Sequence, residues 1–142
     1  MSMFEILEKY KHNGHFDFLQ NDNLASVCNA PTNKSGVYMV WDASNKEKDL
    51  LYIGRSGKKV DGIIRHRIGG LKDRLVNGHQ FGKIPRKRSW PIIMKQNDIR
   101  TLSVNWFDTE NDDPVEIERI LLKEVIDLIG VLPCWNNQPY WD

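Results

Sequence analysis

The sequence predicts a small α/β domain of the α+β kind, in which helices flank a three-stranded antiparallel sheet. Two segments with alternating apolar residues, 37–41 and 50–54, enclose a polar stretch and are typical of a β-hairpin. A third alternating segment, 101–107, predicts the third strand. Apolar residues at helical spacing within 114–129 predict the longest helix.

The length of the chain favours one domain, because 142 residues bury enough apolar surface to fold without disulfides or metals. We expect a single domain over 1–142, with a helical and irregular N-terminal extension at 1–35 and a core at 36–137. Cys28 and Cys134 match no metal-ligand spacing, and we expect both to be reduced. No apolar run approaches the roughly 18 residues that a membrane helix needs. These features predict a cytoplasmic protein that does not contact a membrane.

Charge is distributed unevenly along the chain. Residues 55–100 contain 13 Lys and Arg against three Asp and Glu, whereas the other residues contain seven against 16. The net charge of the whole chain is only +1. Such a division predicts a basic face for a polyanion and an acidic face directed elsewhere. The alternative is a solvated basic loop region.

Other elements follow from local signals. We expect a short helix at 3–10 and mostly irregular structure at 16–35, with one helical turn near 24–28. Leucines four residues apart predict a helix at 71–77. Trp90 and Pro91 are expected to open another short helix, with proline at its favoured first position.

Two tyrosines are the most distinctive residues of the predicted hairpin. If the hairpin is centred on Asn45, Tyr38 pairs directly with Tyr52, and both phenols lie on one face of the sheet. We expect that face to carry the chemistry. Gly36 and Gly54 flank the strands at positions where a ligand or another backbone can approach closely. Apolar residues are expected to cover the opposite face as core: Val37, Met39, Trp41, Leu51 and Ile53.

The predicted long helix has clear boundaries. Asp113 is a candidate N-cap, Pro114 takes the first turn, and Gly130 ends the helix. Glu116 lies where a capping box places a carboxylate, and it begins a polar stripe with Arg119, Lys123 and Asp127.

Glu118 lies on the other side of this helix. On a helical wheel it falls within the apolar arc formed by Ile117, Leu121, Leu122, Val125, Leu128 and Ile129. A charged carboxylate directed at a core costs several kcal/mol unless a cation meets it. Glu118 is therefore either half of a buried Glu–Arg pair or a functional carboxylate, and Glu116 is the alternative candidate for function.

The chain resembles the GIY-YIG nuclease family. Gly-Val-Tyr at 36–38 and Tyr-Ile-Gly at 52–54 match the two family motifs, with a slightly longer gap between them. Leu-Lys-Asp-Arg-Leu at 71–75 looks like the family helix whose arginine contacts the scissile phosphate. Glu118 begins the pattern that carries the metal-binding glutamate in the family, and Asn136 matches an asparagine that follows that helix.

Spacing leaves the phosphate-contacting arginine open. In family members with short connections the arginine lies about one turn nearer the second tyrosine, so 57–70 would be an insertion. Arg74 is preferred, and Arg67 and Arg65 are its rivals. Gly69 and Gly70 interrupt any helix that would hold Arg67.

The resemblance implies a divalent-metal-dependent endonuclease that hydrolyses phosphodiester bonds in DNA. It implies Tyr38 as general base, Tyr52 as an orienting residue, Arg74 as the phosphate contact, Glu118 as the ligand of Mg²⁺ or Mn²⁺, and Asn136 as an organising residue. The alternative function is a non-catalytic nucleic-acid-binding module on the same fold.

DNA is the expected partner, with RNA as the other nucleic acid that fits. Specificity would come from the basic loops or from a homodimer or partner chain. The candidate DNA-binding residues are Arg55, Lys58, Lys59, Arg65, Arg67, Lys83, Arg86, Lys87 and Arg88.

Overall fold

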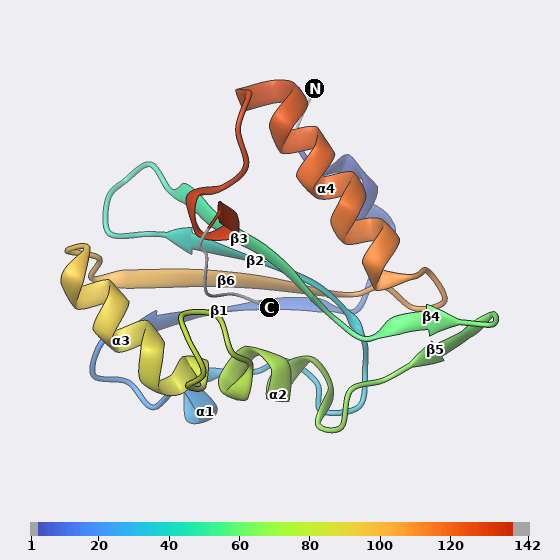
Figure 1. Cartoon of the computed structure of the whole chain (residues 1–142), viewed down its shortest axis with the longest axis horizontal. Coiled ribbons are helices and arrows are strands. Elements are labelled where there is room, and N and C mark those ends of the chain that lie inside the picture. Colours follow the sequence, from blue (N-terminus) through green and yellow to red (C-terminus); the bar gives the residue numbers. More distant parts are fainter. Residues whose placement is uncertain (1–2, 138–142) are drawn as a thin grey trace.

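A four-stranded antiparallel sheet forms the centre of the fold in the computed structural model, which describes residues 3–137 (Figure 1). The strand order is β1, β6, β2, β3, with β1 and β3 at the edges. The bounds of these strands are Asn13–Leu19 for β1, Gly36–Asp42 for β2, Asp49–Ser56 for β3 and Thr101–Asp108 for β6. The expected mixed α and β composition and antiparallel sheet are confirmed, but the sheet has one strand more than predicted.

The additional strand is β1. Phe16 and Phe18 alternate with exposed residues and are buried, and β1 pairs with β6 along its whole length. The prediction of irregular structure from residue 16 onward is therefore wrong for 16–19. The helical turn expected after this strand is present as α1 (Leu24–Val27).

A β-bulge shifts the register between β2 and β3. Tyr38 pairs with Gly54 and Val40 with Tyr52, so the predicted direct pairing of the tyrosines is wrong. Leu51 is the extra residue of the bulge and packs on the side of the tyrosines, contrary to expectation. Tyr38 and Tyr52 nevertheless share a face, because diagonal neighbours in an antiparallel pair point to the same side.

Helices cover both faces of the sheet (Figure 1). One face, here the α4 face, packs against the 3₁₀ helix η1 (Glu5–Lys9) and α4 (Pro114–Ile129). The opposite face, here the α2/α3 face, carries both tyrosines and packs against α1, α2 (Gly70–Asn77), α3 (Arg86–Gln96) and part of η2 (Cys134–Asn137). The face expected to carry the chemistry is therefore also part of the core.

The boundaries of α2 and α4 agree with their sequence signals. Asp113 caps α4 by accepting a hydrogen bond from the backbone N–H of Val115 at 3.0 Å, and Gly130 ends the helix with φ of 97°. The third helix differs from expectation, because α3 begins at Arg86 and Pro91 lies inside it. Pro85 is the N-cap, and its carbonyl accepts the first helical hydrogen bonds, so the helix starts one turn earlier.

A second hairpin occupies the segment expected to be an insertion. Strands β4 (Lys58–Val60) and β5 (Ile63–Arg65) project from the end of the main sheet (Figure 1). Asp61 and Gly62 both have positive φ, as a two-residue hairpin turn requires. Lys59 anchors the hairpin through its backbone N–H to Asp113 Oδ1 at 3.1 Å and through Nζ to the Asn111 carbonyl at 2.8 Å.

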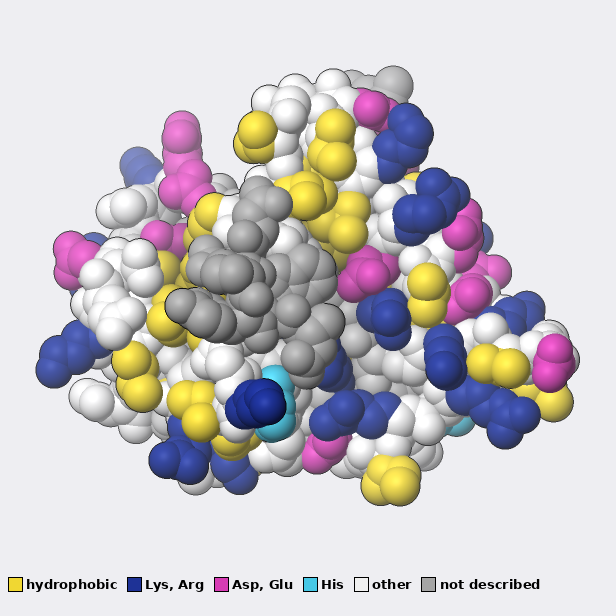
Figure 2. All heavy atoms as spheres, in the orientation of Figure 1, with side chains coloured by type: hydrophobic (Ala, Val, Ile, Leu, Met, Phe, Trp, Pro, Cys, Tyr) yellow, Lys and Arg dark blue, Asp and Glu magenta, His cyan; other side chains and the backbone are white. Residues whose placement is uncertain are grey.

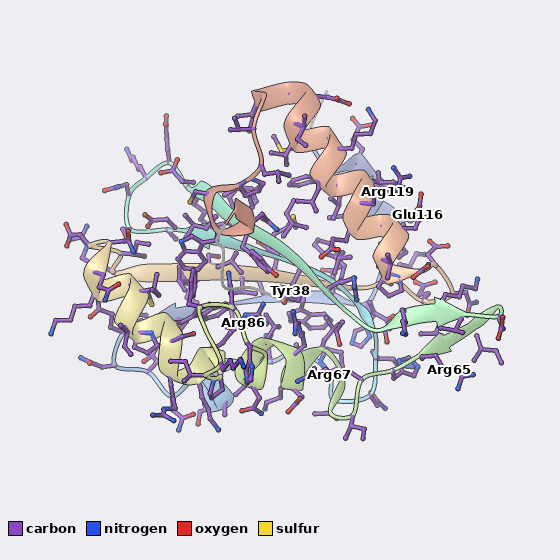
Figure 3. The ribbon with its side chains drawn as sticks, in the orientation of Figure 1. Tyr38, Arg65, Arg67, Arg86, Glu116 and Arg119 are labelled. Atoms are coloured by element: carbon purple, nitrogen blue, oxygen red, sulfur yellow. The ribbon has the colours of Figure 1, made fainter. Side chains whose placement is uncertain are left out.

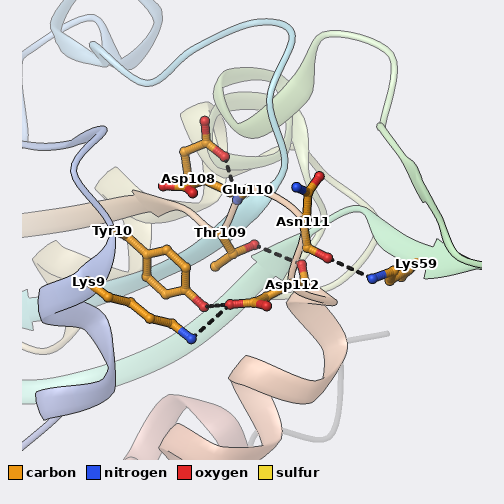
Figure 4. A network of polar contacts seen from close by, with 8 residues as sticks. All are labelled: Lys9, Tyr10, Lys59, Asp108, Thr109, Glu110, Asn111 and Asp112. Carbon is orange, nitrogen blue, oxygen red and sulfur yellow. Dashed lines mark hydrogen bonds and ion pairs between the residues drawn. The ribbon is translucent and has the colours of Figure 1, made fainter.

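The loop between β6 and α4 joins several elements (Figure 4). Tyr10 donates a hydrogen bond to Asp112, and Lys9 Nζ lies 3.0 Å from the same carboxylate. Burial and this hydrogen bond raise the pKa of Tyr10 and keep the phenol protonated. The network fixes the N-terminal end of α4 relative to η1 and to the β4–β5 hairpin. None of the helices within residues 3–137 combines the length and apolar character needed to cross a membrane.

Candidate active site

A cavity of about 260 Å³ lies at the edge of β3, where α2 and α4 approach from opposite faces of the sheet. Side chains reach it from both directions because successive strand residues alternate between faces. Arg55 points toward α4, whereas Tyr52 belongs to the α2/α3 face. The cavity is lined by Tyr52, Arg55, Ser56, Gly57, Arg67, Arg74 and Glu118.

The two tyrosines form a tightly packed pair. Their ring centroids are 6.1 Å apart, and both side chains are almost completely buried. A Cβ atom on Gly54 would lie 2.5 Å from Tyr38 Oη and 2.6 Å from Tyr52 Cε2. On Gly36, a Cβ atom would lie 1.8 Å from the carbonyl oxygen of Phe107. Gly54 is therefore required by close packing around the tyrosine pair, and Gly36 by the close approach of the β6 backbone.

Arg74 brings a positive charge to the two phenols. Electrostatic interaction with Tyr38, and more weakly with Tyr52, raises the pKa of Arg74 despite its burial. The guanidinium therefore remains charged. Its Nε atom and the Tyr38 hydroxyl are both buried without a hydrogen-bond partner of good geometry among the residues described.

The structure distinguishes the three arginines that the sequence left open. Arg74 and Arg67 line the cavity, whereas Arg65 is exposed on β5 (Figure 3). Arg67 donates from Nε to Asp73 at 2.9 Å, so its charge is partly satisfied within the protein. Arg74 alone of the three touches the tyrosine pair.

Glu118 reaches the cavity from α4. Its side chain is 23% exposed, and Arg55 Nε lies 3.4 Å from Oε1. Burial raises the pKa of Glu118, and Arg55 and Arg74 offset part of that rise. The ion pair with Arg55 matches the predicted Glu–Arg pair, which was one of the two alternatives for Glu118. The same residue also lines the cavity, as the other alternative, a functional carboxylate, requires.

The helical wheel misplaced the centre of the buried face of α4. Ile117, Leu121 and Val125 are buried, but Leu128 and Ile129 are 62% and 59% exposed. Glu118 therefore lies at the flank of the helix, directed at the edge of β3, and not at the middle of its core face.

Glu116 lies away from the cavity. It forms an exposed ion pair with Arg119 on the outer side of α4 (Figure 3). The hydrogen bond from Arg119 lowers the pKa of Glu116. The carboxylate of Glu116 thus binds Arg119. The capping-box prediction had instead placed this carboxylate at the backbone N–H of the N-cap residue.

The Asn136 side chain forms hydrogen bonds with the backbone of the edge strand β3. Its Oδ1 accepts from the Ile53 N–H and its Nδ2 donates to the Ile53 carbonyl, both at 3.0 Å. The buried amide thus replaces a neighbouring strand at the residue between Tyr52 and Gly54. Asn136 does not line the cavity, so its contribution is to hold this part of β3 in place.

Five of the nine predicted DNA-binding residues form two exposed groups. Arg55 and Arg67 line the cavity, Lys59 anchors the β4–β5 hairpin, and the ninth residue is an exception. Lys58 and Arg65 belong to the projecting hairpin, while Lys83, Lys87 and Arg88 are exposed at or before the start of α3. Figure 2 shows Lys and Arg side chains along the lower part of this face, between the hairpin and α3.

Arg86 is the exception. Its side chain is completely buried, so the expectation that it belongs to an exposed basic run is wrong. The chain places it at the first residue of α3, and the first turn of that helix directs it inward beneath the tyrosine pair (Figure 3).

Sequence reasoning also missed Ser56. This residue lines the cavity, and its Oγ is buried and has no hydrogen-bond partner among residues 3–137. The two-residue period of β3 could have identified it, because Ser56 follows Tyr52 and Gly54 on the same face.

A divalent cation would have one carboxylate ligand in this cavity. Within the described part of the chain, no three His, Cys, Asp or Glu side chains converge on a common point. Glu118 shares the cavity with Arg55, Arg67 and Arg74, so the cavity by itself favours an anion. One carboxylate fits Mg²⁺, which keeps several of its waters and is commonly completed by phosphate oxygens.

Comparisons of the chain with protein-family models, curated proteins and solved structures gave no match.

Proposed function

We propose that this protein is a divalent-metal-dependent endonuclease that hydrolyses phosphodiester bonds in DNA. The main support is that Tyr52, Arg74 and Glu118, which come from three separate elements, line one cavity beside Tyr38. These are the residues on which the resemblance to GIY-YIG nucleases depends. A purely structural arrangement gives no reason for them to meet at an open edge of the sheet.

The cavity is suited to a phosphate group. Arg74 remains charged and lines the cavity, so its guanidinium can donate to a non-bridging oxygen. Ser56 also lines the cavity, and its buried hydroxyl has no hydrogen-bond partner within residues 3–137. Fixed donors aimed at an oxygen that gains charge stabilise the transition state without reorganisation.

The proposed reaction transfers one proton to Tyr38. Tyr38 in its phenolate form accepts a proton from water as the water oxygen forms a bond to phosphorus, and the bond from phosphorus to the leaving oxygen breaks, so that this oxygen leaves with the electron pair. Arg74 compensates the charge on the phosphate and on the phenol. Tyr52 lines the cavity and Tyr38 lies behind it, so Tyr52 is the group that orients the water toward Tyr38.

Glu118 is the residue that would hold Mg²⁺ or Mn²⁺. Arg55 contacts one of its oxygens, and the partly exposed carboxylate faces the cavity. The bound ion would supply charge stabilisation at the leaving oxygen. Asn136 supports the site indirectly by fixing Ile53.

Duplex DNA would lie along the basic residues beside the cavity. The β4–β5 hairpin starts next to Gly57 in the cavity wall, and it presents Lys58 and Arg65 to solvent. The hairpin is held by Lys59 on one strand, and by a 2.7 Å contact between His66 and Ser35 after the other. A firmly held basic projection suits contacts with phosphates on either side of a cleavage point.

A non-catalytic nucleic-acid-binding module is the second candidate. Two observations favour it: Tyr38 is fully buried, and Arg55 already pairs with Glu118. In that function the arginines would hold a backbone phosphate without cleaving it.

Cleavage of supercoiled plasmid with Mg²⁺, with and without chelator, tests the two functions. Wild type should nick or linearise the plasmid, Glu118→Gln should not, and the matched control Glu116→Gln on the same helix should behave like wild type. Tight binding without cleavage by wild-type protein would favour the binding module.

A further inference from the structure

Arg86 lies beneath both tyrosines of the candidate site. Its Cζ is 5.4 Å from the ring centroid of Tyr38 and 5.5 Å from that of Tyr52, and Trp90 is the third ring at 5.8 Å. The side chain has no exposure to solvent. Arg74 therefore approaches the phenols from the cavity side, and Arg86 approaches the same pair from the interior.

Polar contacts fix the guanidinium in this place. Its Nε donates to Gln80 Oε1 at 2.9 Å, and the same oxygen accepts from Trp90 Nε1 at 3.1 Å. Its Nη1 donates to the backbone carbonyl of Arg74. A Cβ atom on Gly78 would lie 2.7 Å from Nη1, so this glycine leaves room for the contact.

Within residues 3–137, no acidic side chain forms an ion pair with Arg86. Its contacts are neutral oxygens and aromatic rings, and Nη2 is buried without a hydrogen-bond partner among residues 3–137. A buried cation is normally paired, because removing it from water is costly. The faces of aromatic rings attract a cation, and a phenol ring that gains negative charge attracts it more strongly.

We propose that Arg86 is a positioning residue that holds Arg74 through its backbone and stabilises the phenolate form of the tyrosine pair, the form that accepts the proton. This inference rests on the proposed nuclease function. In this proposal Arg86 acts inside the protein. Its position among Lys83, Lys87 and Arg88 in the sequence had instead suggested a phosphate contact.

The charged groups around the tyrosines support this role. Burial and the neighbouring Tyr38 raise the pKa of Tyr52 to about 12, Arg86 and then Arg74 oppose this rise, and Glu118 adds to it. Of the two arginines, Arg86 therefore favours ionisation of Tyr52 more than Arg74 does. These groups come from β2, β3, α2, α3 and α4, the elements that surround the pair.

The test removes the charge of Arg86 while retaining its bulk. Arg86→Met and Arg86→Gln are compared with wild type for the pH dependence of single-turnover cleavage in Mg²⁺ and for duplex binding in Ca²⁺. In both variants the increase of the cleavage rate with pH should occur about one pH unit higher than in wild type, so that the rate at neutral pH is roughly tenfold lower. The affinity for duplex DNA should change little. Arg86→Lys should restore part of the rate.

Arg88→Met is the matched control, because Arg88 is exposed on the same helix and should affect binding without moving the pH profile. Circular dichroism and thermal unfolding establish that each variant is folded. A folded Arg86→Gln or Arg86→Met with the wild-type pH profile would overturn the inference. If both neutral variants fail to fold, Arg86→Lys decides, because it keeps the charge but loses the planar guanidinium that donates to the Arg74 carbonyl. A folded Arg86→Lys with the full wild-type rate would then overturn the positioning role.

A second measurement does not need cleavage. The ultraviolet absorbance of tyrosinate reports ionisation, and Tyr38→Phe and Tyr52→Phe backgrounds assign the signals. Ionisation should require higher pH in Arg86→Gln than in wild type. If wild-type protein shows no cleavage but this shift is present, the nuclease function fails and the electrostatic role of Arg86 stands. An unchanged titration overturns the role of Arg86 whether or not the protein is a nuclease.

Discussion

The two faces of the central sheet are both buried, but their chemistry differs. On the α4 face, Val37, Met39 and Ile53 pack against apolar side chains such as Ile117 and Leu121. On the α2/α3 face, the alternate residues of the same strands include two tyrosines that lie against two arginines. One strand therefore supplies an ordinary core on one side and a polar interior on the other.

Unsatisfied hydrogen-bonding groups are confined to one of these regions. Six buried side-chain polar atoms lack partners within residues 3–137, and none belongs to η1 or α4. Each such group costs about 1–3 kcal/mol. The comparison indicates that the α4 face is an apolar core and that the α2/α3 face retains costly buried polar groups, two of which belong to the cavity-lining residues Ser56 and Arg74. The atoms are Tyr38 Oη, Ser56 Oγ, Arg74 Nε, Gln80 Nε2, Arg86 Nη2 and Ser89 Oγ.

The largest expected effect is loss of metal-dependent cleavage in Glu118→Gln, measured on plasmid DNA. Folding should be retained, and stability at neutral pH should be equal or higher, because burial raises the pKa of Glu118 and so disfavours its charged form in the folded state. This gain should disappear as pH falls below the ordinary glutamate range of about 4.3, where both states are protonated. Full activity in this variant would remove Glu118 from the mechanism.

Tyr38→Phe should lower the single-turnover rate by roughly 10²- to 10⁴-fold, because it removes the proposed proton acceptor. Duplex affinity in Ca²⁺ should hardly change. The increase of rate with pH should vanish in this variant, and Tyr52→Phe should cost less. The opposite ranking of the two variants would exchange the roles of the tyrosines.

Leu121→Ala tests the structural face. Its side chain is completely buried on the α4 face, so the free energy of unfolding should fall by about 2–5 kcal/mol in urea denaturation. Tyr38→Phe removes an unsatisfied hydroxyl and should leave stability unchanged or slightly higher. Equal destabilisation by the two substitutions would contradict the division between the faces.

Reversal of exposed basic residues should have a smaller, cumulative effect on DNA binding. Charge reversal of Lys58, Arg65, Lys87 and Arg88 should lower the slope of log K against log salt by about one for each lost phosphate contact. Lys123, exposed on α4 and paired with Asp127, is the control position. An unchanged slope would show that these side chains do not contact DNA.

Asp112→Asn should produce the smallest change, a modest loss of stability above pH 4 to 5. Hydrogen bonds from Tyr10 and Lys9 lower the pKa of Asp112, so its contribution is present above the ordinary aspartate pKa of about 3.9 and is lost as pH falls. Thermal unfolding at neutral and acid pH measures the difference in stability between wild type and Asp112→Asn. Wild type and variant should converge in acid, and a gap that persists there would exclude the ionic contribution.

Local sequence patterns predicted β2, β3, β6, α2 and α4 because each has alternation, helical spacing or caps within its own residues. They also identified the motif residues that meet at the cavity or beside it. The misses depend on distant partners. β1 becomes a strand by pairing with β6, and the burial of Arg86 is set by the rings of Tyr38 and Tyr52. The bulge at Leu51 left no local signal that distinguishes it from regular alternation.

The interior position of β6 has a consequence for the order in which the protein assembles. β6 separates β1 from β2 in the sheet, although both of those strands precede it in the chain. During synthesis on the ribosome, only the β2–β3 hairpin can form early among the main strands, because β1 lacks its neighbour until Thr101–Asp108 has emerged. Most of the sheet therefore depends on pairings between distant segments, which form slowly and leave apolar strands exposed to aggregation in the nascent chain.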